Sequence, residues 1–162
     1  MKLASYNIQY GKAKDGLFDL DRIVSQLGDP DLIALQEVET HTARSGMVHQ
    51  AREIAARLPH MHWVYGTGID LDASEVIDGR PVHRRRQFGN IVLSRWPILS
   101  MINHTLPKIA LRNTFHLQRT LVECVTDAPS GALRFCLVHL DHVSTDRPGS
   151  GGIPVQFAAA RT

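Results

Sequence analysis

The stretch Leu32-Ile-Ala-Leu-Gln-Glu-Val38 decides the fold prediction because it is almost continuously apolar. Such a run is typical of a strand that is covered on both faces, as in a parallel sheet. Residues 2–8 indicate an earlier strand. Between the two, apolar residues recur with the spacing of one helix face: Leu20, Ile23, Val24 and Leu27. This order predicts an α/β layer whose first two strands are parallel.

Both predicted helices have recognisable ends. Asp19 can cap the first helix, Gly28 can end it, and Pro30 cannot continue it. The second helix is expected to end at Pro59. Its apolar residues share one face: Met47, Ala51, Ile54, Ala55 and Leu58.

The rest of the chain indicates strands joined by turns, which favours antiparallel pairing. The expected strands are 63–67, 88–94, 98–106, 120–126 and 133–140. Between the first two of these we expect a long polar loop, residues 68–87, and loops of that length are often functional. A glycine-rich loop is expected at 149–152, and a helix is expected to begin at 157–160.

Composition narrows the class of protein. The chain has 162 residues, 43% apolar, which suits one globular domain, residues 1–162, rather than two. It contains no apolar run long enough to cross a membrane and no secretory leader, so we expect a cytoplasmic location. The net charge of +2 does not by itself indicate a polyanionic partner.

The cysteines are too few for a disulfide framework. Cys124 and Cys136 flank a turn signal at 127–131, so a hairpin closed there would place them nearly opposite each other. We expect both to be reduced, because the cell interior disfavours disulfides.

Two polar residues stand at the carboxyl ends of the first two strands. Asn7 and Glu37 would lie at the edge where parallel sheets bind ligands. An amide oxygen and a carboxylate suit magnesium, which takes few protein ligands and keeps several waters. The alternative is that both merely cap strand ends, and the residues alone leave both interpretations open.

His139 ends another apolar strand, at 133–138. A histidine there can donate a hydrogen bond to a phosphate that is developing charge, or it can simply bond to a loop carbonyl. Asp141 and His142 follow closely. Consecutive strand residues point to opposite faces, so all three side chains cannot converge without a bend.

Five segments in order resemble the endonuclease/exonuclease/phosphatase superfamily, the DNase I-like metal-dependent phosphodiesterases, over residues 2–142. They are Ser-Tyr-Asn-Ile-Gln-Tyr-Gly (5–11), Leu-Gln-Glu-Val (35–38), Phe-Gly-Asn-Ile-Val-Leu-Ser-Arg-Trp-Pro-Ile (88–98), Arg-Thr-Leu (119–121) and Val-His-Leu-Asp (138–141). The resemblance implies an α+β sandwich with a four-layer αββα architecture. It also implies hydrolysis of phosphate esters, by in-line attack of water, with Mg²⁺ as cofactor and Mn²⁺ as the alternative ion.

The resemblance also assigns residues. Asn7 matches the asparagine near metal and phosphate, Glu37 the main magnesium ligand, and His139 the histidine that contacts the scissile phosphate. Residues 89–95 match a segment that we interpret as mostly architectural, with a phosphate-facing role for Asn90 as the alternative. The resemblance assigns no role to Asp141, which is a candidate substrate-binding residue and the first candidate for a substitute base if the chain alone hydrolyses phosphate esters.

The sequence also departs from the family pattern. The family supplies an Asp-x-Asn motif, whose aspartate activates water, and a terminal Asp-His pair; neither is found in these 162 residues. We therefore expect the chain to correspond to the first part of a family member and to be inactive or weakly active alone. The missing part should leave the inner face of the first sheet uncovered and favour self-association. Candidate residues for that face are Ile91, Leu93, Leu121, Val125 and Leu137.

The basic run Arg84-Arg85-Arg86 suits phosphate contact, including a nucleic-acid backbone. The alternative is a solvated loop whose arginines pair with Glu75 and Asp78. Three hypotheses for function follow: a phosphoric-ester hydrolase, a non-catalytic remnant that binds phosphate or metal, and a nucleic-acid-binding module. The substrate, whether DNA, RNA, a lipid head group or an inositol phosphate, is not determined by the sequence.

Overall fold

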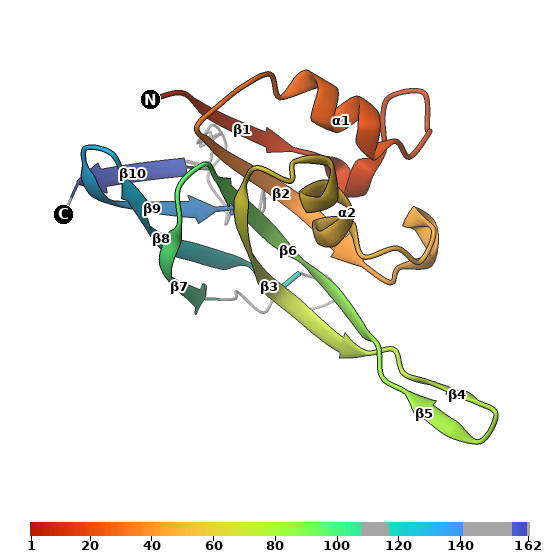
Figure 1. Ribbon diagram of the computed structural model, residues 1–162. Coiled ribbons are helices and arrows are strands. Elements are labelled where there is room, and N and C mark those ends of the chain that lie inside the picture. The colour runs from red at the N-terminus through yellow and green to blue at the C-terminus, as the bar shows by residue number, and fades with distance from the viewer. Residues whose placement is uncertain (108–116, 141–156, 162) are drawn as a thin grey trace, which may run out of the picture.

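The computed structural model describes residues 1–107, 117–140 and the backbone of 157–161. In this part of the chain, two four-stranded sheets pack against each other, and the helices cover the outer face of one of them (Figure 1). This is the sandwich arrangement expected from the sequence, with one helical layer described. No described helix has the length and apolar character needed to span a bilayer.

The first sheet has the strand order β1-β2-β6-β3. Its strands are β1 (Leu3–Asn7), β2 (Leu32–Thr40), β6 (Arg85–Ser94) and β3 (His62–Asp72). Strands β1 and β2 are parallel, as predicted, and β6 pairs antiparallel with β2 and β3. The carboxyl ends of β1 and β2 therefore meet at one edge of the sheet.

Two α-helices cover this sheet: α1 (Leu20–Gln26) and α2 (Gln50–Arg57). Asp19 caps α1 as predicted, accepting a hydrogen bond from the Arg22 amide at 2.9 Å. Helix α2 begins later than expected because His49 caps it. Met47 is therefore outside the helix, exposed and at a φ of 59°, which corrects its predicted place on the buried face.

Side chains on β2 and β6 alternate between two cores. Odd-numbered residues such as Ile33, Leu35, Ile91 and Leu93 pack with the helices. Even-numbered residues such as Leu32, Ala34 and Val92 pack between the sheets. There they meet residues from the second half of the chain: Val122, Cys124, Ala128, Leu133, Phe135 and Leu137. The sequence shows that these strands are buried on both faces, but it does not say which face meets which layer.

The second sheet has the order β10-β9-β8-β7 and is antiparallel throughout. Its strands are β7 (Ile98–Thr105), β8 (Thr120–Ala128), β9 (Gly131–Val138) and β10 (Phe157–Arg161). The helix expected at 157–160 is thus wrong, since this segment is strand β10. A four-residue apolar run cannot nucleate a helix by itself, and β9 offers it an edge with which to pair.

The expectation of an uncovered inner face is also wrong, because the second sheet covers it. Ile91 and Leu93 face the helices, and Leu137 lies in the core between the sheets. Leu121 and Val125 alternate with buried residues of β8, so they lie on the outer face of the second sheet, half-buried.

Residues 68–87 are largely strand rather than the long loop expected. Strands β3 and β6 extend past the body of the sheet, and β4 (Glu75–Ile77) pairs with β5 (Arg80–Val82) beyond them. Figure 1 shows this segment, which we call the arm (residues 70–86), projecting from the rest of the molecule.

Both cysteines are free, as predicted. Cys124 lies opposite Phe135, whereas Cys136 lies opposite Glu123. This offset of one residue places the two thiols on opposite faces of the sheet rather than side by side. Burial raises the pKa of the Cys124 thiol to about 12, so this thiol is not reactive at neutral pH.

Candidate active site

Asn7 is the last residue of β1 and lies opposite Gln36 of β2. Its Oδ1 accepts a hydrogen bond from the Gln9 amide at 2.9 Å. This contact turns the chain into the short 3₁₀ helix η1 (Gln9–Gly11), in which Gln9 and Tyr10 have left-handed φ angles of 46° and 48°. Asn7 is thus held at the strand end with its amide group half-buried.

Glu37 occupies an irregularity in β2. The pairing of β2 with β6 shifts between Leu35 and Val38, and Glu37 has a φ of 59°. A bulge of this kind re-aims one side chain, and a left-handed backbone costs energy for any residue except glycine. No described residue donates a hydrogen bond to the Glu37 carboxylate, which is 18% exposed. The strand therefore bends to aim this carboxylate at His139, its ion-pair partner among the described residues.

His139 follows β9 and is 8% exposed. Its Nε2 lies 3.7 Å from Oε1 of Glu37, although the two residues belong to different sheets. Its Nδ1 lies 3.0 Å from Nη1 of Arg119. An arginine can only donate, so Nδ1 must accept, and the ring proton of the neutral imidazole is on Nε2, facing Glu37.

Arg119 immediately precedes β8. In the sequence it stands out only as part of the family-like motif Arg-Thr-Leu (119–121). Its Nε is buried, and no described residue accepts from it. Gly68 makes this placement possible, because a Cβ there would collide with the Gln118 carbonyl oxygen. A larger residue at position 68 would thus push apart the strand and the segment that carries Arg119.

Asn90, on β6, is 3% exposed and faces the second sheet. Its Nδ2 donates to the Thr120 carbonyl at 3.3 Å, which joins the two sheets next to Arg119. It also lines a small cavity together with Arg119 and His139. Arg95, at the end of the same motif, donates to the Pro30 carbonyl at 3.1 Å, in keeping with the architectural interpretation.

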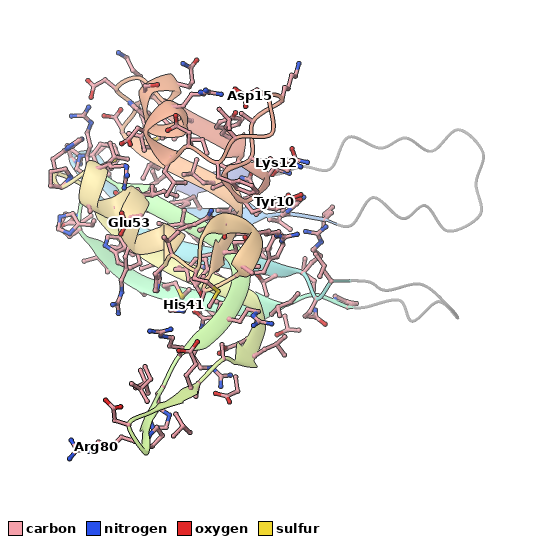
Figure 2. All side chains as sticks on the ribbon, turned by 90° about the vertical axis from the view of Figure 1, so that its right-hand side faces the viewer. Tyr10, Lys12, Asp15, His41, Glu53 and Arg80 are labelled. Carbon is pink, nitrogen blue, oxygen red and sulfur yellow. The ribbon has the colours of Figure 1, made fainter. Side chains whose placement is uncertain are left out.

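The arginine run lies on the arm rather than with Glu37. Arg84 pairs with Glu75 at 3.0 Å, as the solvated-loop interpretation expected, and Arg85 pairs with Asp70 at 2.7 Å rather than with Asp78. Arg86 is exposed on β6. Figure 2 shows Arg80 at the tip of the arm, well apart from Tyr10 beside the strand ends. Asp141 lies outside the described residues.

The donor set fits magnesium in its chemistry. Glu37, in the bulge of β2, offers a carboxylate whose described ion-pair partner is His139 at 3.7 Å, and Asn7 offers an amide oxygen at the end of the neighbouring strand β1. Within the described residues, no group of at least three His, Cys, Asp or Glu side chains gathers around a possible ion. A site with one carboxylate and several waters is the kind that magnesium accepts and zinc does not.

Comparison with known protein families decides the family. The model of the "Endonuclease/Exonuclease/phosphatase family" matches residues 4–150. The chain belongs to this family. The match spans Asn7, Glu37 and His139, and members of the family are hydrolases of the endonuclease, exonuclease or phosphatase type. None of the curated proteins matches the chain.

Two solved structures of the endonuclease/exonuclease/phosphatase family share the fold. One, from Beutenbergia cavernae DSM 12333, has a TM-score of 0.67 and 24% identity over 90% of this chain. The other, a family protein from Leptotrichia buccalis C-1013-b, has a TM-score of 0.57 and 15% identity over 87%. The chain spans 39% and 54% of the lengths of those two proteins.

Proposed function

We propose that this site hydrolyses phosphate esters with the help of magnesium, by in-line attack of water. The carrying observation is the approach of Glu37 and His139, which bring a carboxylate and an imidazole N–H together from two sheets. A metal ligand beside a hydrogen-bond donor is what a phosphoryl group requires, since its reaction depends on positioning and charge stabilisation.

Each residue has a distinct role in this proposal. Glu37 and Asn7 would hold the ion, which when bound would neutralise charge on the phosphate. His139 would donate its Nε2 proton as a hydrogen bond to a phosphate oxygen. Arg119 would keep that proton on Nε2 by occupying Nδ1. Asn90, Arg84, Arg85, Arg86 and Asp141 stay predictions as substrate-binding residues.

Metal binding provides the first test. Glu37→Ala should abolish magnesium binding in isothermal titration calorimetry while the protein stays folded, because the carboxylate loses only its 3.7 Å approach to His139 and no hydrogen bond from the described residues. His139→Gln should retain the metal and weaken phosphate binding, because magnesium prefers oxygen to imidazole nitrogen. Unchanged magnesium affinity in Glu37→Ala would remove Glu37 from the metal site.

Turnover provides the second test. We expect the 162-residue chain to cleave bis(p-nitrophenyl) phosphate weakly, with a rate that depends on magnesium and is lost in Glu37→Ala. Absence of a general base alone slows such reactions by about 10²–10⁴-fold. Magnesium binding without any turnover would favour the non-catalytic alternative, and turnover that survives Glu37→Ala would contradict the proposal. Arg57→Gln, a change in the helical layer, serves as the matched control.

Substrate class and location belong to the same proposal. A phosphodiester such as a nucleic acid is the substrate that the family favours. Because Arg84 and Arg85 are paired within the arm, they offer less to a nucleic-acid backbone than free arginines would. The cytoplasmic location and self-association stay predictions.

A further inference from the structure

A buried ion pair lies next to the bulge that presents Glu37. Glu39 is 1% exposed, and its carboxylate accepts from Arg44 Nη2 at 2.7 Å and from Arg44 Nε at 3.0 Å. A buried carboxylate needs such compensation, since an isolated one is very costly. One edge of the Arg44 guanidinium is thereby fixed.

The face of the same guanidinium rests on an aromatic ring. Cζ of Arg44 lies 3.7 Å from the centre of the Tyr10 ring, a cation–π contact. Tyr10 comes from η1, the turn that follows Asn7, and Figure 2 shows it on the same side of the molecule as Lys12. Arg44 is thus held by residues from both strand ends of the candidate site.

A single amide side chain fixes the ring and the carboxylate together. Gln50, 2% exposed at the start of α2, donates from Nε2 to the Tyr10 carbonyl at 2.6 Å. Its Oε1 accepts from the Glu39 amide at 3.0 Å. Gly11 leaves room for this arrangement, because a Cβ there would lie 3.1 Å from Gln50 Nε2. The pocket for Arg44 is therefore preorganised before any ligand arrives.

The remaining edge of Arg44 is open. No described residue accepts a hydrogen bond from its Nη1, and 47% of the side chain is exposed. Arg44 also lies close enough to Glu37 for their charges to interact. A guanidinium with one edge held by a carboxylate and the other edge facing solvent is suited to binding two phosphate oxygens at once.

We propose that Arg44, pinned by Glu39 and stacked on Tyr10, binds a phosphate group of the substrate beside Glu37. The inference rests on the proposed function for the identity of that substrate. It adds to the site an anion-binding residue from the loop after β2, distinct from the arginines of the arm. Its role is to position the phosphate, so its loss should affect substrate binding more than the chemical step.

The test is phosphate binding without metal, measured on the full chain by NMR with inorganic phosphate as the probe. Arg44→Lys keeps a positive charge for Glu39 but removes the open fork. The paired change Glu39→Gln with Arg44→Gln removes both charges of the ion pair and guards against simple misfolding. We expect the dissociation constant for phosphate to rise about tenfold or more in each, the equivalent of one charge-assisted hydrogen bond. The wild-type Arg44 Nε–H signal should shift on titration.

Arg57→Gln is the matched control, because Arg57 is also held by carboxylates, Asp21 and Glu53, but in the helical layer. It should leave phosphate affinity unchanged. Equal affinity in wild type and both Arg44 variants would overturn the inference, whatever the turnover assay shows. Conversely, Arg44-dependent phosphate binding without magnesium-dependent turnover would leave the anion site standing and favour the non-catalytic alternative to hydrolysis. The two failures are therefore distinguishable.

Discussion

At the scale of single residues, left-handed backbone gathers around the strand ends that carry the candidate site. Gln9, Tyr10, Glu37 and His41 all have φ angles between 46° and 59° without being glycine. Each such residue costs roughly 1–2 kcal/mol, so the surrounding contacts must hold it in place. Gln50 and the Glu39–Arg44 pair are contacts of this kind. The strained backbone and the Glu37 carboxylate, which accepts no hydrogen bond from the described residues, occur together, as is typical of functional sites.

His49 should make the stability of the protein depend on pH. It caps α2 by accepting from the Arg52 amide at 3.3 Å. Its pKa lies below the ordinary value of 6.5, mainly because of burial and secondly because of the Arg52 charge. The unfolded chain therefore takes up this proton at a higher pH than the folded chain. Stability that is present above pH 6.5 is lost as pH falls through the lower, folded pKa.

His49→Asn should reduce this acid sensitivity, because asparagine is a good helix cap that does not titrate. We expect wild type to lose more stability than the variant between about pH 7.5 and about pH 5, the range in which histidine changes charge. Urea unfolding at both pH values measures the difference. His62→Asn is the control, as His62 is exposed and caps no helix. An equal loss in wild type and His49→Asn would remove His49 as the cause.

At the scale of elements, pairing partners decide what short segments become. The segment at 157–161 is a strand because β9 pairs with it along its whole length. The arm is a hairpin because Asp72 and Arg85 still lie opposite each other, with β4 and β5 beyond them. The apolar side chains at the tip of the arm, Val76 and Ile77, are 75% and 46% exposed. The arm is therefore held in place mainly by backbone pairing between its strands, with little burial of side chains.

Shortening the arm should therefore cost little. Replacing residues 73–84 with Asn-Gly keeps the pairing of Asp72 with Arg85 and closes it with a favoured two-residue turn. We expect the free energy of unfolding to change by no more than about 0.5 kcal/mol, as for surface changes in general. Urea unfolding measures it, and hydrogen exchange should show fast-exchanging amides at 75–82 in wild type. A loss above about 2 kcal/mol would mean that the arm packs against the body.

At the scale of the whole molecule, the sandwich itself assembles the site. Glu37 comes from the first sheet and His139 from the second, and the core between the sheets fixes their separation. The second sheet also exposes apolar side chains. Leu99 and Ile102, on its edge strand β7, are 60% and 53% exposed. An open edge beside apolar side chains favours association with a second copy.

Self-association is thus expected through β7 rather than through the inner face. Light scattering coupled to size exclusion should give a molar mass that is a multiple of 18.1 kDa. Ile102→Lys should shift the protein toward monomer, because it buries a charge in the contact. Val76→Lys, which changes a still more exposed side chain on the arm, should not. A monodisperse wild-type monomer would contradict this prediction.

The sequence by itself determined the β-α-β-α order of the first part of the chain and the residue types of the candidate site. The parallel pair β1–β2, the cap at Asp19 and the strand-end positions of Asn7 and His139 follow from local patterns. Glu37, expected at a strand end, lies instead within β2, at its bulge. Five ordered motifs also sufficed for the family. These features can be predicted because strand periodicity, helix caps and motif spacing each depend on residues that are close together in the sequence.

Only the tertiary structure decided which surfaces meet. It placed Ile91 and Leu93 against helices, turned 157–161 into a strand, and brought Arg119 to His139 and Arg44 to Tyr10. It also revealed the bulge that aims Glu37. Contacts between residues far apart in sequence depend on how whole sheets pack. The alternation of side chains along a strand, with a period of two residues, shows that the strand has two faces, but it does not show what covers either face.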